Sequence, residues 1–117
     1  MGRLTTHALD TARGLPGSGV TVSVFRVEGN TRQLLHHVVT NQNGRGDEAL
    51  LEGEALTVGV YELVFNLTAY FAANGQVLPN PPFVGDVVLR VGIADSSQHY
   101  HVPLLFSPWS YSTYRGS

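Results

Sequence analysis

The strongest constraint on the fold is a two-residue alternation of apolar and polar side chains. In the segment GVTVSVFRVEG, Val20, Val22 and Val24 share one face. The alternation recurs in GVYELVFNL, where Tyr61 and Leu63 are two of the apolar positions. Successive side chains of a β-strand point to opposite faces, so this spacing predicts strands with one buried face.

Further segments extend this pattern along the chain. VVLRVGI and HYHVPLLF are two more predicted strands, and GLPGSG, NQNGRGD, PNPPF and ADSSQ carry turn residues. TAYFAANG is the one predicted helix, with Thr68 as its N-cap and Gly75 as its C-terminal stop. We therefore expect an all-β, antiparallel β-sandwich of seven to eight strands with one short helix, as a single domain over residues 1–117.

Composition excludes several classes of function. The chain has no cysteine, so thiol chemistry and cysteine metal sites are absent. Its formal net charge is −2 and it contains no lysine, so we expect it to bind no nucleic acid and no acidic membrane surface. No apolar run reaches the ~20 residues that span a bilayer. We expect a cytoplasmic protein whose partner is a small molecule or another protein.

The densest group of chemically capable side chains lies near the end of the sequence, in HYHVPLLFSPWSYSTYRGS. A two-residue period places His99 and His101 opposite the apolar row of Tyr100 and Val102, so the histidines point away from the core. If YSTYRGS pairs with HYHVP, Tyr114 shares the surface of His101. The sequence thus predicts a polar face formed by two neighbouring strands.

Two further residues could act on this face. His7 lies in LTTHALD, a predicted strand in which His7 opposes Leu4, Thr6 and Ala8. Arg45 lies between two glycines in NQNGRGD, where it could bind a carbonyl or carboxylate by a forked hydrogen bond, or could be an ordinary exposed hairpin arginine.

The histidine spacing leaves a metal alternative open. His99 and His101 are two residues apart on one face, and His7 would complete a set of three zinc ligands with an open fourth position. No acidic side chain that would orient these histidines can be assigned from the spacing. We therefore expect no metal.

Four segments together resemble one known family. LTTHALDTARG, TNQNGRGD, PPFVGDVVLRVGIAD and the final HYHVPLLFSPWSYSTYRGS are similar to the 5-hydroxyisourate hydrolases, the transthyretin-related enzymes, over nearly the whole chain. The resemblance implies a transthyretin-like sandwich, assembled as a homotetramer with its sites in a central channel. It implies catalytic roles for His7, Arg45 and His101, and substrate contacts for Tyr114, Arg115, Ser117 and His99.

The activity that this resemblance implies is hydrolytic ring opening of 5-hydroxyisourate in urate catabolism, which yields 2-oxo-4-hydroxy-4-carboxy-5-ureidoimidazoline. The mechanism that the resemblance implies uses a histidine as general base, without metal or cofactor. Two other functions remain open on the sequence. One is a transthyretin-like carrier that binds a small ligand without catalysis, and the other is a zinc hydrolase. Which histidine takes the proton from water is open as well.

Overall fold

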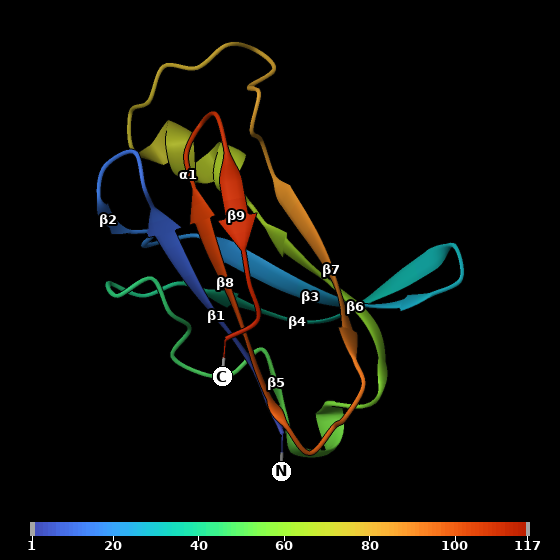
Figure 1. Ribbon diagram of the computed structural model, residues 1–117. Helices are drawn as coiled ribbons and strands as arrows, with labels where there is room; N and C mark the ends of the chain where they lie inside the picture. The colour runs from blue at the N-terminus through green and yellow to red at the C-terminus, as the bar shows by residue number, and fades with distance from the viewer. Residues whose placement is uncertain (1, 117) are drawn as a thin grey trace.

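The computed structural model describes residues 2–116, which form a sandwich of two β-sheets (Figure 1). One sheet, here sheet A, has the strand order β2-β1-β8-β9, with β5 paired to β1. The other, sheet B, has the order β4-β3-β6-β7. The elements are β1 Arg3–Asp10, β2 Leu15–Pro16, β3 Thr21–Glu28, β4 Thr31–Val39, β5 Leu51–Glu52, the 3-10 helix η1 Gly53–Ala55, β6 Gly59–Phe65, α1 Leu67–Ala73, β7 Val87–Ile93, β8 His99–Phe106 and β9 Tyr111–Thr113.

The predicted sandwich is confirmed, with two corrections. Residues 2–116 contain nine strands rather than seven or eight, because β2 and β5 are two-residue strands too short to show a period. The sheets are also not wholly antiparallel, since β1 and β8 pair in parallel from Arg3↔His99 to Asp10↔Phe106. A parallel pair needs a long crossover. Here sheet B and α1 lie in the chain between the two strands.

The core lies between the sheets, where the alternating rows meet. Val20, Val22 and Val24 of the β3 segment are fully buried, as are Leu63 and Phe65 of β6. Each fully buried side chain of this size contributes about 1.5–3 kcal/mol relative to an exposed one. The same alternation in β1 and β8 directs every second side chain outward, and this outer face of sheet A carries the predicted site residues.

Helix α1 closes one end of the sandwich (Figure 1). The rings of Tyr70 and Phe106 meet edge to face with centroids 5.3 Å apart, and the Tyr70 hydroxyl donates to the buried Asp10 carboxylate at 2.8 Å. Burial, followed by the hydrogen bond to Asp10, raises the pKa of Tyr70 to about 12. This contact fixes the helix to the last residue of β1.

The predicted ends of α1 are half right. Gly75 follows the C-cap with a φ of +72°, and its N–H donates to the Ala72 carbonyl at 3.1 Å, so the predicted stop is confirmed. The N-cap is Asn66 rather than Thr68. The Thr68 N–H donates to the Asp86 carboxylate at 3.1 Å. Because Asp86 lies 18 residues away, a local sequence motif cannot predict this contact.

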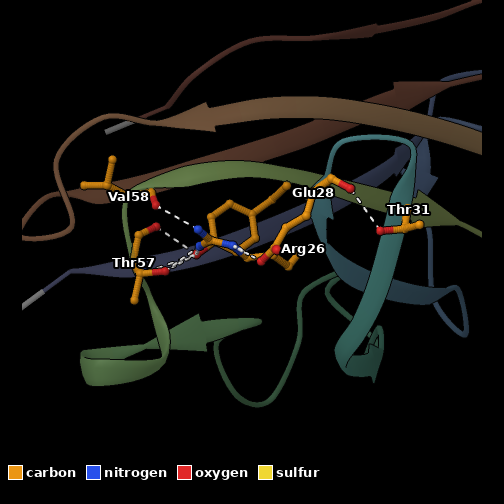
Figure 2. Close-up of polar contacts among 6 residues, drawn as sticks. Arg26, Glu28, Thr31, Thr57 and Val58 are labelled. Carbon is orange, nitrogen blue, oxygen red and sulfur yellow. Dashed lines mark hydrogen bonds and ion pairs between the residues drawn. The ribbon is translucent and has the colours of Figure 1, made fainter.

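A polar cluster joins β3 to the segment that enters β6 (Figure 2). Arg26 donates to the Thr57 hydroxyl at 2.5 Å and to the Val58 carbonyl at 3.2 Å, and it lies 3.6 Å from Glu28. The buried Tyr61 hydroxyl donates to the Thr57 carbonyl at 2.7 Å. These contacts link β3 to the segment that enters β6, and they lie in sheet B rather than on the outer face of sheet A. No helix within residues 2–116 is long and apolar enough to cross a membrane.

Candidate active site

A groove of about 980 Å³ lies on the outer face of sheet A. Its walls come from β1, the segment 45–50, β8 and the tail that follows β9. The groove brings together six of the seven predicted site residues, and the seventh, Ser117, lies outside the described residues. The six are His7, Arg45, His99, His101, Tyr114 and Arg115.

His7 is held by the loop that follows β4. The His7 Nε2 atom lies 2.8 Å from the Asn43 carbonyl oxygen, and the backbone N–H of Ala8 donates to the Gly44 carbonyl at 2.8 Å. A carbonyl oxygen only accepts, so Nε2 carries the proton. In the neutral ring Nδ1 is then the nitrogen with a free lone pair, so His7 can accept a proton there.

The loop that carries Arg45 depends on one asparagine and one glycine. The Asn41 side-chain oxygen accepts hydrogen bonds from the N–H groups of Asn43 at 2.9 Å and Arg45 at 3.2 Å. Gly44 has a φ of +78°, and a Cβ there would lie 2.3 Å from the Ala8 carbonyl oxygen. Only glycine allows the loop to approach β1 so closely. The approach forms the His7↔Arg45 bridge.

His101 is contacted on two sides. Its Nδ1 lies 2.8 Å from the Thr5 hydroxyl, and its backbone carbonyl accepts the Gly116 N–H at 2.7 Å. A Cβ on Gly116 would lie 2.9 Å from His101 Cδ2, so the tail backbone packs directly against the ring. Thr5 lies 96 residues before His101 in the sequence, and Gly116 lies in the tail that follows β9.

The electrostatics of the groove favour the neutral form of both rings. Burial, followed by the positive charge of Arg45, lowers the pKa of His7, and the Asn43 carbonyl offsets part of this effect. Burial, Arg45 and then His7 lower the pKa of His101. Within residues 2–116 the Arg45 guanidinium forms no ion pair. Arg45 therefore has donors for an anionic or carbonyl ligand, and a neutral imidazole with a free lone pair can accept a proton.

The tail is tied down by Arg115. Its guanidinium donates to the Gln98 side-chain oxygen at 3.0 Å and to the His99 carbonyl at 3.1 Å, and it lies 4.2 Å from the centre of the Tyr100 ring. A guanidinium engaged in this way holds the chain in position. Tyr114 is left 61% exposed on the groove, where its ring can contact a ligand.

Three contact residues were not predicted from the sequence. Thr5 could most readily have been predicted, because it lies two residues before His7 on the same face of β1. Asn43 acts through its backbone carbonyl, and Gly116 acts by having no side chain, so neither leaves a local pattern. Within the described chain no three His, Asp or Glu side chains converge as metal ligands, and His7, His99 and His101 form no such set.

Comparison with known proteins gives the chain's family. Residues 4–116 match the profile of the HIUase/Transthyretin family. The 5-hydroxyisourate hydrolase of Pseudomonas aeruginosa is 56% identical over 117 residues, which cover all of this chain and 93% of that protein. The crystal structure of an (S)-allantoin synthase, at 43% identity and a TM-score of 0.93, matches 99% of this chain, which spans only 44% of that longer chain.

A second solved structure agrees over its full length. The 5-hydroxyisourate hydrolase of Klebsiella pneumoniae is 36% identical with a TM-score of 0.83, and the match covers all of both chains. The groove, the fold and these matches lead to one conclusion. The chain belongs to the HIUase/Transthyretin family.

Proposed function

We propose that this chain is a 5-hydroxyisourate hydrolase whose groove on sheet A activates water by general-base catalysis. The substrate follows from the relatives, which are named for this activity at up to 56% identity over the whole chain. The observation that supports the chemistry is the pairing of two imidazoles of lowered pKa with an arginine free of ion pairs in the described residues.

The reaction opens the six-membered ring at an amide bond. A histidine of the His7 and His101 pair removes a proton from water, the oxygen adds to the ring carbonyl, and the carbon–nitrogen bond breaks as the leaving nitrogen takes up a proton. A positioned general base supplies roughly 100-fold to 10,000-fold. Arg45 stabilises the charge that develops on the carbonyl oxygen, which is often the largest contribution.

The tail and His99 complete this proposed site. Tyr114 packs on the substrate ring and His99 contacts its polar edge, both from positions that line the groove. Arg115 contributes by anchoring the tail, since its guanidinium already contacts Gln98 and the Tyr100 ring. Ser117 remains a predicted substrate contact.

The same proposal includes assembly into a homotetramer with the groove facing a central channel. Strand β9 is an edge of sheet A, and its Tyr111 is 49% exposed. The backbone N–H and C=O groups on the open side of an edge strand can pair with the strand of a second copy. Sedimentation measures this directly, and a stable monomer at micromolar concentration would contradict the channel.

The decisive experiment adds purified protein to freshly generated 5-hydroxyisourate and follows its ultraviolet decay. We expect rapid decay, unchanged by chelators, and loss of most turnover in His7→Ala, Arg45→Ala, His101→Ala and a truncation lacking residues 114–117. His37→Ala is the matched control, because His37 is an exposed histidine outside the groove. Binding without turnover would indicate a carrier, and loss of activity on chelation, restored by zinc, would indicate a metal hydrolase.

A further inference from the structure

Thr5 and His101 face each other across the parallel pair of β1 and β8. They are direct partners in the strand register, and both side chains lie half-buried on the outer face of sheet A. The Thr5 hydroxyl is 2.8 Å from His101 Nδ1, although 96 residues separate them. A strand pair fixes this contact more rigidly than a loop would, because both backbones are hydrogen-bonded along their length.

A hydrogen bond at one ring nitrogen decides what the other can do. A neutral imidazole has one N–H donor and one acceptor, and the partner of the first nitrogen selects the tautomer. Within residues 2–116, Nδ1 is the one acceptor that the Thr5 hydroxyl contacts. When the hydroxyl donates to Nδ1, Nε2 must carry the ring proton.

His7 carries its ring proton on the same nitrogen as His101, but a different nitrogen of the ring is engaged. Its Nε2 proton points to the Asn43 carbonyl, so its free lone pair is on Nδ1. The two neutral rings then offer different groups to a ligand, since His7 has a lone pair on Nδ1 that can accept a proton and His101 has an N–H on Nε2 that can donate a hydrogen bond. Hydrolysis of an amide uses both, because the proton that His7 takes from water can pass to the leaving nitrogen, while the His101 N–H stabilises the charge that develops on the carbonyl oxygen.

We propose that Thr5 is a positioning residue that donates to His101 Nδ1 and so holds His101 as a hydrogen-bond donor from Nε2, opposite the proton acceptor His7. The proposal rests on the proposed hydrolysis in this groove. Thr5 lines the groove, and the role assigned to it here acts through the His101 ring. Its effect is to fix both the tautomer and the orientation of that ring.

The first test reads the tautomer without any substrate. Nitrogen-15 NMR of histidine-labelled protein at neutral pH should show both His101 and His7 with Nδ1 unprotonated and Nε2 protonated. His101 protonated at Nδ1 would overturn the proposal. This result is independent of activity, so it stands apart from the outcome of the hydrolase assay.

The second test removes the hydroxyl. Thr5→Val keeps the branched shape, and we expect about tenfold lower kcat with a changed His101 signal, whereas Thr5→Ser should restore kcat to within about twofold. Thr11→Val is the matched control, since its hydroxyl donates to the Phe106 carbonyl rather than to a histidine. Wild-type turnover in Thr5→Val would overturn the positioning role. If Thr5→Val fails to fold, Thr5→Ala and the tautomer of the unaltered protein decide the question.

Discussion

Replacing Gly116 with alanine separates the contribution of the tail to catalysis from its contribution to stability. The φ of Gly116 is outside the left-handed region, so alanine can adopt this backbone. The added methyl carbon, however, would lie 2.9 Å from His101 Cδ2 and 3.1 Å from His101 Cβ. Carbon atoms prefer about 3.5–4.0 Å, so the tail and the ring must separate by about 0.6–1 Å.

The magnitude follows from this displacement. A misplacement of about 1 Å at a reacting group costs on the order of 100-fold in rate, so we expect a fall of between about 10-fold and 100-fold in kcat/KM. The free energy of unfolding should fall by no more than the contribution of the hydrogen bond from the Gly116 N–H to the His101 carbonyl, about 0.5–1.5 kcal/mol. The variant should therefore remain folded at assay temperature while losing most of its turnover.

The assay is ultraviolet decay of 5-hydroxyisourate, with the thermal midpoint measured on the same sample. Gly85→Ala is the control, because its added carbon would meet the Thr68 hydroxyl at 3.3 Å, outside the groove. An unchanged kcat/KM in Gly116→Ala would refute the claim that the tail positions His101.

Three further predictions concern pH and stability. The acid limb of kcat/KM should lie below pH 6.5, because the pKa values of both groove histidines are lowered and their neutral forms persist into mild acid; a limb above 6.5 would contradict this. Gly44→Ala should destabilise by at least 1–2 kcal/mol, roughly the cost of a left-handed residue, plus the clash with the Ala8 carbonyl, and an unchanged urea midpoint would contradict it. Tyr70→Phe should cost about 1–3 kcal/mol in urea unfolding by removing the donor to Oδ2 of the buried Asp10 carboxylate, whose Oδ1 keeps the Arg13 N–H, while turnover persists.

The alternation of apolar and polar side chains correctly predicted which residues share a face of a strand, but it did not predict which strands pair. It identified the buried rows of β3 and β6 and put His101 and Tyr114 on one surface, and the groove contains both. A period of two does not encode strand direction, so the parallel pair of β1 and β8 was not predicted. Thr31–Val39 left no signal either, because most of its side chains are exposed on an edge strand.

The site was predictable where side chains carry the chemistry and unpredictable where the backbone does. Imidazole and guanidinium groups can be recognised in a sequence, and their strand parity indicates a shared face. The Asn43 carbonyl that selects the His7 tautomer belongs to the main chain, which every residue has. The close approach of Gly116 to His101 is likewise set by tertiary geometry.

The parallel pairing of β1 with β8 also bears on how the protein folds. Sheet B is built from residues 21–93 by antiparallel pairs, and Figure 1 shows it as a continuous layer. Joining Thr5 to His101 requires closure of a loop of 96 residues, and such non-local pairings form slowly. During synthesis or refolding, sheet B can form before β1 finds β8. Enzymatic activity should then appear after most of the β-structure, as a late reporter of complete folding.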